Sequence, residues 1–599
     1  MAMEFRDFRN VHEMLMETVE RGGDRPAYRT IGNGSELHTV SWREFAGDVH
    51  RAARSLVALG VGRGDKANIL SYSNYRWVLT DLALMSIGSC AAGIYHSLLP
   101  KDVKHIVNHS DSVLVFAQDE AQVAKLLEIR SEIPAVRRVI LMYGAPPDDE
   151  WVISYDEFLE LGAGVPNEAL EARIAEVTPA DVAAIVYTSG TTGVPKGAVL
   201  THDNITFTAQ SVLGSGEIHD GDETLLFLPL AHVFARTCVF TAMVAGSATT
   251  FARSIETVAE DFKIARPHWF PSAPRVYEKV HAKIIAGAQA KGGAALKIFN
   301  WAVKVGLEVS DLKVAKRPIP PLLAAKYAIA NKLVFSKVQA ALGGRVRWCI
   351  SGAAPLNPEI GRFFHAAGVL ILEGIGMTEN TSFTNINRFE NYRFGWVGPT
   401  GPGIEQKTAE DGEVLYRGRN IMREYYKMPA ETAETLTPDG WQHTGDLGEI
   451  DDEGFLRITG RKKDLIVTAG GKNVAPSAIE GQIALSPYIS QVCVIGDRRP
   501  YLVALITVDA DNIRAFAADR GLVVDDFQAL LESDEVQGLI GSVVEETNRN
   551  LASFETIKKF QLLPEFSIAD GLLTPTMKVK RNIAMERHAD LIEEMYAGK

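Results

Sequence analysis

The sequence is poor in cysteine and has no cysteine pattern that would bind a metal. Four cysteines occur in 599 residues, and none has a close cysteine or histidine partner. Disulfide-rich small domains and zinc modules are therefore disfavoured. The residues around each cysteine are apolar, which predicts buried, reduced thiols at Cys90, Cys238, Cys349 and Cys493.

Long apolar runs and a positive net charge are also missing. No stretch of about 18 uncharged apolar residues is present, so no membrane span is expected. The first 15 residues contain acids and lack an apolar core, which disfavours a signal peptide. The net charge of −13 disfavours a nucleic-acid partner. We therefore expect a cytoplasmic protein that does not bind nucleic acid.

Apolar patterns of two kinds alternate along the chain. Ser41 and Glu44 have capping-box spacing at the start of a helical pattern that Gly60 can end. Short apolar runs at 183–188, 223–230, 346–351 and 368–374 are typical of buried strands. Strands that alternate with helices predict an α/β fold, in which helices sandwich parallel or mixed sheets.

The pattern changes after residue 460. Residues 452–474 predict two strands around a basic turn, and residues 492–509 predict a hairpin. We expect a large N-terminal domain over 1–462 and a small α+β C-terminal domain over 463–599.

Residues 279–337 are unusually basic and helical in pattern. They hold ten lysines and Arg317 against only Glu308 and Asp311, so the local charge is 11 minus 2, or +9. One interpretation is a solvated helical hairpin. The other is a surface that meets anionic lipid or an anionic ligand.

A glycine- and hydroxyl-rich segment, "YTSGTTGVPKGAVLTH", covers Tyr187 to His202. Its glycines let backbone N–H groups approach a ligand closely, and such amides form an anion-binding concavity. Lys196 adds a positive charge. Polyphosphate is the ligand that matches this chemistry. The segment is not a P-loop of the GxxxxGK[ST] kind, since the lysine follows Pro195.

This segment resembles the phosphate loop of the adenylate-forming superfamily, which includes acyl-CoA synthetases, firefly-type luciferases and nonribosomal adenylation domains. Five further stretches resemble the family's motifs in the family's order, and together the motifs extend from about residue 40 to 582. They are "FLPLAHVFAR" (227–236), "SGAAPL" with "GIGMTE" (351–356 and 374–379), "WQHTGDLG" (441–448), "GRKKDLIVTAGGKNVAPSAIE" (460–480) and "LTPTMKVKR" (573–581).

The resemblance implies a two-step reaction: a carboxylate attacks ATP to give an acyl-adenylate, and a thiol, usually of coenzyme A, then displaces AMP. It implies ATP and Mg²⁺ as cofactors and coenzyme A as co-substrate. It assigns catalytic roles to Lys578, His232 and Lys196, and Mg²⁺ ligation to Glu379 and Thr188. It assigns cofactor binding to Thr188, Ser189, Gly190, Thr191, Thr192, Gly193, Gly352, Ala353, Glu373, Gly374, Ile375, Thr378, Asp446, Arg461, Lys463 and Gly470.

Two positions depart from the family's pattern. Ile375 stands where an aromatic residue commonly stacks on adenine, and Met577 stands where a glycine usually precedes the lysine. Lys580 is the neighbouring alternative to Lys578. Lys463 matches the hinge about which the C-terminal domain is expected to rotate between the two half-reactions.

The residues after the acyl motif resemble long-chain fatty acyl-CoA synthetases, actinobacterial members in particular. The substrate is then expected to be a long-chain fatty acid in an apolar tunnel, with Val233, Phe234, Phe240 and Met377 as candidate walls. The basic segment is expected to contact the inner membrane surface peripherally, and a homodimer is a further expectation.

Three other functions stay open at this point. A fatty acyl-AMP ligase would load an acyl carrier protein, although that class usually carries an insertion after the hinge and none follows Lys463. A luciferase-like oxygenase is disfavoured by the basic helical segment. A binding protein with a degenerate site would account for Ile375.

Overall fold

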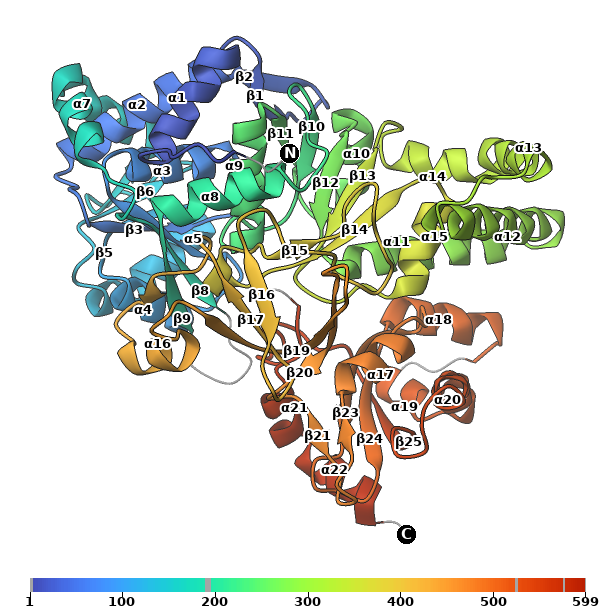
Figure 1. Cartoon of the computed structure of the whole chain (residues 1–599). Coiled ribbons are helices and arrows are strands. Elements are labelled where there is room, and N and C mark those ends of the chain that lie inside the picture. The colour runs from blue at the N-terminus through green and yellow to red at the C-terminus, as the bar shows by residue number, and fades with distance from the viewer. Residues whose placement is uncertain (1–3, 189–194, 523–525, 575–576, 598–599) are drawn as a thin grey trace.

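The computed structural model describes residues 4–188, 195–522, 526–574 and 577–597. Figure 1 shows a large sheet-rich part that holds the N-terminus, a helical arm at its side and a smaller part that holds the C-terminus.

One eight-stranded sheet of the large part is parallel in its centre and antiparallel at both edges. Its strands, in spatial order, are β15 (Asn385–Ile386), β14 (Leu370–Ile375), β13 (Trp348–Ser351), β12 (Trp269–Ser272), β10 (Glu223–Leu226), β11 (Ala248–Phe251), β1 (Pro26–Ile31) and β2 (Leu37–Ser41). Helices cover both faces of such a parallel region, and strands β10 to β13 are accordingly buried along nearly their whole length.

A second eight-stranded sheet has the same character, with parallel inner strands and antiparallel pairs at one edge. In spatial order it contains β18 (Glu424–Tyr425), β9 (Lys196–Thr201), β8 (Val182–Thr188), β4 (Cys90–Ile94), β3 (Lys66–Leu70), β5 (Ser112–Ala117), β6 (Arg138–Leu141) and β7 (Val152–Ser154).

Helix α9 (Val233–Ala245) lies between these two sheets. All but one of its residues are buried, and a helix that is apolar all round must be covered on every side. Phe240 packs in a cluster with Ala184 of β8, whereas Ala242 packs in a cluster with Trp269 of β12. The sheets are therefore joined through a helix whose N-cap is a predicted site residue, His232.

The N-terminal helices confirm the capping prediction. Helix α2 (Trp42–Ala58) begins after a capping box of Ser41 and Glu44, and Gly60 follows its end with φ +73°. The other helices that cover the sheets are α1 (Val11–Gly22), α3 (Tyr75–Ser86), α4 (Pro100–His109), α5 (Glu120–Glu128), α6 (Tyr155–Leu161), α7 (Asn167–Glu176), α8 (His202–Leu213), α10 (Val258–Ala265), α15 (Pro358–Ala366) and α16 (Pro429–Thr435).

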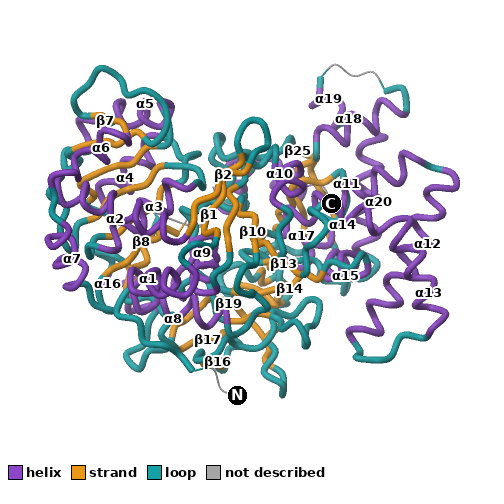
Figure 2. Tube along the Cα trace, turned by 90° about the horizontal axis from the view of Figure 1, so that it is seen from above, coloured by secondary structure: helices purple, strands orange, loops and turns teal. Residues whose placement is uncertain are grey.

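The basic segment forms the helical arm. Its elements are α11 (Pro274–Lys291), α12 (Gly293–Val314), α13 (Pro321–Ala330), a π-helical turn (Asn331–Phe335) and α14 (Ser336–Ala341). Helix α12 packs against α13 and α15, and both views show α12 and α13 projecting from the sheets (Figures 1 and 2). The predicted helical insertion is confirmed, and it begins a few residues earlier than expected because Pro274 starts α11.

An antiparallel four-stranded sheet leads to the C-terminal part, and the sequence did not predict it as a unit. It is built from β16 (Glu405–Thr408), β17 (Glu413–Arg417), β19 (Gln442–Ile450) and β20 (Leu456–Arg461). The strands predicted on either side of the basic turn exist as β20 and β21 (Ile466–Val467), but they belong to different sheets because β21 pairs with β22 (Asn473–Val474).

The C-terminal part has its own sheet and core. The predicted hairpin is confirmed as β23 (Ile489–Ile495) and β24 (Leu502–Val508), and β25 (Ile557–Leu563) adds a parallel strand. No hydrophobic cluster of the described residues mixes side chains before 459 with side chains after 465. Its helices are α17 (Pro476–Ile483), α18 (Ala510–Asp519), α19 (Phe527–Leu531), α20 (Asp534–Asn548), α21 (Arg581–Arg587) and α22 (Ala589–Ala597).

All four cysteines are buried and free, as predicted. Within the described ranges, no helix combines the length and the apolar character that crossing a bilayer requires.

Candidate active site

The glycine-rich segment joins two paired strands. Thr188 ends β8 and faces Lys196 at the start of β9 in antiparallel register, and the Thr188 hydroxyl donates to the Lys196 carbonyl at 3.4 Å. The predicted residues between them, Ser189, Gly190, Thr191, Thr192 and Gly193, lie outside the described residues. The strand ends fix where both ends of this segment lie.

Lys196 and Glu379 meet at a tyrosine that sequence reasoning missed. The Lys196 ammonium lies 5.1 Å from the ring centroid of Tyr425, and the Tyr425 hydroxyl donates to Oε1 of Glu379. Glu379 is buried in a 3₁₀ turn, Thr378–Asn380, that follows β14. Tyr425 lies on β18, an edge strand of two residues with no motif of its own, so no signal in the sequence could have found it.

His232 caps the N-terminus of α9. Its Nδ1 accepts from the backbone N–H of Phe234 at 3.2 Å. Burial, together with the nearby Lys578 charge, lowers the pKa of His232 to about 4. The ring is therefore neutral at pH 7, and its proton lies on Nε2 because Nδ1 accepts. His232 can donate that N–H to an anionic oxygen.

The ends of β13 and β14 bring four more predicted residues together. Gly352 and Ala353 follow β13, and Ala353 has φ +70°. Glu373 and Gly374 lie on β14. The Glu373 carboxylate is buried and accepts from the Gly395 N–H at 3.0 Å, and burial raises its pKa to about 7.

The β14 exit is sterically tight. A Cβ at Gly376 would lie 2.1 Å from the backbone of Ser382, so only glycine fits there. Ile375 is half-buried against the hydrophobic cluster of Trp269 and Trp348. Thr378, three residues after Ile375, starts the 3₁₀ turn.

Asp446 and Arg461 form an ion pair across neighbouring strands. They are register partners in β19 and β20, and Arg461 Nε donates to Asp446 Oδ1 at 2.7 Å. Asp446 is buried, whereas about half of the Arg461 side chain is exposed. The exposed part of the Arg461 side chain remains available to a ligand.

Lys578 comes from the C-terminal part and faces this ion pair. Burial and the Arg461 charge lower the pKa of Lys578, and the Asp446 charge opposes them. Although neighbouring groups remove water from around its amine, the residue as a whole is exposed to solvent. Its backbone N–H donates to the Thr574 hydroxyl at 3.1 Å. Lys578 therefore lies within electrostatic range of His232, Asp446 and Arg461.

Lys463 and Gly470 lie apart from this cluster. Lys463 is exposed between β20 and β21, and Gly470 is exposed in the turn between β21 and β22. The backbone contacts of that turn stay within the C-terminal part, where Ala469 N donates to Arg499 O at 2.9 Å.

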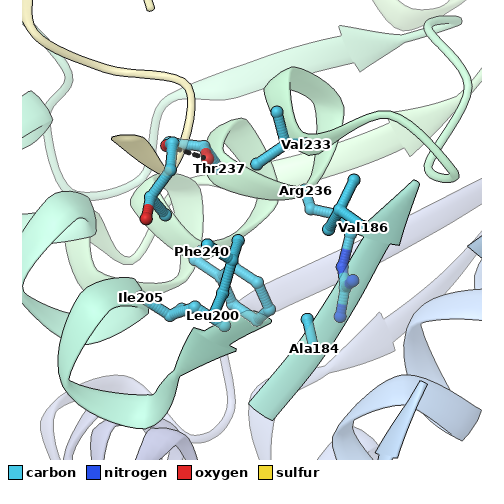
Figure 3. A pocket seen from close by; sticks show the side chains of 9 residues that line it. Ala184, Val186, Leu200, Ile205, Val233, Arg236, Thr237 and Phe240 are labelled. Carbon is cyan, nitrogen blue, oxygen red and sulfur yellow. Dashed lines mark hydrogen bonds between the residues drawn. The ribbon is translucent and has the colours of Figure 1, made fainter. Parts of the chain in front are cut away.

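A small apolar cavity lies between α9 and strands β8 and β9 (Figure 3). Two of the four candidate acyl walls, Val233 and Phe240, line it, and Phe234 and Met377 do not. Phe234 instead lies over Gly352. The cavity is lined by Ala184, Val186, Leu200, Ile205, Val233, Arg236, Thr237, Phe240 and Thr381.

Two solved structures share the fold of the whole chain. The A domain of carboxylic acid reductase from Segniliparus rugosus, in complex with AMP and a co-purified carboxylic acid, matches with TM-score 0.78 at 21% identity over 99% of this chain and 95% of that one. The anthranilate CoA ligase AuaEII in complex with anthranoyl-AMP matches with TM-score 0.75 at 19% identity, over 99% and 100%. The predicted fold class is confirmed.

Sequence relatives cover the chain almost completely. The long-chain-fatty-acid–CoA ligase FadD15 of Mycobacterium bovis is 36% identical over 98% of this chain and 97% of its own length. The human long-chain-fatty-acid–CoA ligase ACSBG2 is 30% identical over 98% and 92%.

The family models agree with the motifs. The AMP-binding enzyme model matches residues 15–426, and the model of the AMP-binding enzyme C-terminal domain matches residues 463–599. The chain therefore belongs to the AMP-binding enzymes of the adenylate-forming superfamily.

Proposed function

We propose that this enzyme activates long-chain fatty acids with ATP and then transfers the acyl group to coenzyme A, giving acyl-CoA, AMP and pyrophosphate. The observation that carries the proposal is the cluster of Lys578, His232, Asp446 and Arg461, built from both parts of the chain. Full-length similarity to enzymes named long-chain-fatty-acid–CoA ligases supports the substrate class.

The first half-reaction needs charge stabilisation more than proton transfer. A fatty acid is ionised at pH 7, because carboxyl pKa values lie near roughly 4. Its oxygen attacks the α-phosphorus of ATP, and the bond to the β-phosphate oxygen breaks to release pyrophosphate. Lys578 and the Nε2–H of His232 donate to the oxygens on which charge develops, and Lys196 neutralises the phosphates.

The nucleotide is proposed to lie along the ends of β13 and β14 and the middle of β19. Asp446 would accept from the ribose hydroxyls, since a carboxylate has two acceptor oxygens, and Arg461 would hold Asp446 in place. Ile375 would cover the adenine without aromatic stacking. The neighbouring backbone at Gly352, Ala353, Glu373 and Gly374, with Thr378, would form the rest of the adenine site.

The residues present fit Mg²⁺ when it arrives with the nucleotide. The described residues hold no group of three His, Cys, Asp or Glu that could bind a metal alone. Glu379 and the Thr188 hydroxyl offer oxygen ligands of the kind Mg²⁺ prefers, and phosphate oxygens would complete the set. Bound Mg²⁺ would neutralise phosphate charge.

The second half-reaction is proposed to use a rotated C-terminal domain. Separate hydrophobic clusters before residue 459 and after residue 465 support domains of 1–462 and 463–599 that can move as bodies about Lys463. Rotation would withdraw Lys578 and present the turn at Gly470 to coenzyme A, whose thiolate attacks the acyl carbon while AMP leaves.

The acyl chain is proposed to enter beside α9, where Val233 and Phe240 border the apolar cavity. Burying each methylene stabilises by about 0.8 kcal/mol, so the depth of this space would decide chain length. An alternative product, an acyl group on a carrier protein, is disfavoured by the CoA-ligase relatives.

We also propose that the basic arm contacts an anionic membrane. Within the described residues, none of the ten lysines of 279–337 forms an ion pair. Their charge is therefore available to a partner. Large apolar side chains stand exposed beside them, namely Ile298, Trp301, Leu322, Ile329 and Leu333. A homodimer stays a prediction that light scattering would check.

The first assay measures pyrophosphate release from ATP in the presence and in the absence of palmitate. The second supplies either coenzyme A or acyl carrier protein and measures the thioester that forms. We expect release only with palmitate and thioester only with coenzyme A. Release without any fatty acid, or transfer to the carrier protein alone, would contradict the proposal.

A further inference from the structure

A hydrogen bond joins the two parts of the chain through two residues that are not among the predicted site residues. The guanidinium Nη2 of Arg275 donates to the hydroxyl of Ser490 at 3.0 Å. That hydroxyl in turn donates to the carboxylate of Glu565. Arg275, Ser490 and Glu565 therefore form a chain of two hydrogen bonds, called the relay below, that begins in the large part and ends in the small one.

The large part holds Arg275 firmly. It is the second residue of α11, which begins two residues after β12 ends. Two residues on, the Tyr277 hydroxyl donates to the Ile350 carbonyl at 3.0 Å inside the core. Glu278 lies 3.5 Å from the same guanidinium, so a carboxylate on its own helix orients Arg275.

The small part holds Ser490 equally firmly and links it to Lys578. Ser490 is 3% exposed on β23. Arg581, three residues after Lys578, donates to the Val494 carbonyl of β23 at 2.7 Å and pairs with Glu480 at 2.6 Å. The position of β23 therefore fixes the position of the Lys578 segment.

We infer that Arg275 and Ser490 are positioning residues that favour the orientation in which Lys578 faces His232. The inference rests on the proposed function, in which the two parts must rotate between half-reactions. Rotation that withdraws Lys578 carries β23 with it and separates Ser490 from Arg275. The Ser490 hydroxyl lies between the charges of Arg275 and Glu565. Its hydrogen bond to Arg275 is a contact of modest strength, so it can break and form again in each catalytic cycle.

The functional test compares the half-reactions in Arg275→Ala, Ser490→Ala and the double variant. We expect palmitoyl-adenylate formation to fall about fivefold in each single variant and no further in the double variant. Conversion of preformed palmitoyl-AMP and coenzyme A to thioester stays unchanged or becomes faster. Arg51→Ala, which breaks a comparable pair with Asp48 at 3.2 Å on α2, serves as the control and leaves both rates unchanged.

Three outcomes would overturn the inference: unchanged adenylation, equal losses in both half-reactions, or additive losses in the double variant. Arg275→Lys, which keeps the charge and the fold but cannot reproduce the fork geometry, gives an intermediate adenylation rate. If it instead matches Arg275→Ala with a lowered melting temperature, the role is structural.

A second readout does not depend on activity. Dyes on Lys297→Cys of α12 and Arg514→Cys of α18 report the distance between the two parts, and both positions are exposed while the native cysteines are buried. Arg275→Ala shifts the distribution away from the orientation described above. An unshifted distribution refutes the relay, whereas absent pyrophosphate release in the unmodified enzyme refutes the proposed function.

Discussion

Met577 adopts a backbone conformation that few side chains tolerate. Its φ is +63°, in the left-handed region that costs a residue with a Cβ about 1–2 kcal/mol. This explains why the family pattern prefers glycine directly before the lysine. Met577→Gly should keep adenylation at or above the original rate, and Met577→Val should lower it, because a β-branched residue fits this region worst. Equal adenylation rates in the two variants would show that this turn does not place Lys578.

Lys578 provides the sharpest test of a single side chain. Under the proposed mechanism, Lys578→Ala removes a cation that stabilises developing charge, and such donors contribute roughly 10²–10³ in rate. We expect adenylation to fall by about that factor and thioester formation from preformed acyl-AMP to persist. Lys580→Ala, two residues away, is the matched control and should retain both steps. Loss of adenylation in the control alone would transfer the role to Lys580.

At this scale the sequence predicts motif residues and misses their neighbours. His232 and Lys578 stand in motifs, so a resemblance finds them. Tyr425, between Lys196 and Glu379, stands in none, because contact across a sheet edge leaves no local pattern. The neutral state of His232 was also beyond the sequence, since it depends on burial and on Lys578 from another part of the chain.

The elements were predictable where local signals agree with tertiary packing. The capping box at Ser41 and the hairpin of β23 and β24 are such cases. The run 223–230 was predicted as one strand, but β10 ends at Leu226, because Pro229 cannot donate to a neighbouring strand. No local sequence pattern indicated that β20 and β21 belong to different sheets.

His202 couples α8 to α1 and should make the fold acid-sensitive. Its Nδ1 accepts from the Val11 N–H at 3.2 Å, and burial lowers its pKa to about 4. The unfolded chain, with a pKa near 6.5, binds the proton first, so stability decreases as pH falls from about 6.5 to 4. His202→Asn keeps an acceptor and removes the titration. Between pH 7 and 5 the original chain should lose about 2 kcal/mol more than the variant in denaturant unfolding.

The free energies of the original chain and of His202→Asn are compared for the unfolding transition of the large part, because the two parts of the chain can unfold separately. Identical pH dependence in the two proteins would mean that His202 is not a source of the acid sensitivity.

On the scale of the whole molecule, composition and alternation predict the class of fold, but they do not predict how the two parts meet. Their hydrophobic clusters are separate, so polar contacts such as Arg275 to Ser490 decide the orientation. Such contacts join residues more than 200 positions apart and have no periodic signature. The motifs predicted which residues belong to the site, and only the structure brings Lys578 to Asp446 and Arg461.

The charge of the arm leads to a prediction for the intact protein. Lys326, Lys332 and Lys337 stand exposed beside apolar Ile329 and Leu333, and each lysine near an anionic surface contributes about 1 kcal/mol. Changing the three lysines to glutamate should weaken binding to vesicles of phosphatidylglycerol and phosphatidylcholine at least about tenfold in co-sedimentation. Binding to phosphatidylcholine alone should be weak throughout.

Net charge by itself could produce the same loss, so the control reverses three lysines elsewhere. Lys101, Lys263 and Lys558 are exposed, and changing them to glutamate alters the total charge by the same amount. If the arm is the docking surface, this control keeps its vesicle binding, and added salt weakens it through screening. Equal losses in both triple variants would assign binding to overall charge, and no binding by the original protein would remove the membrane proposal.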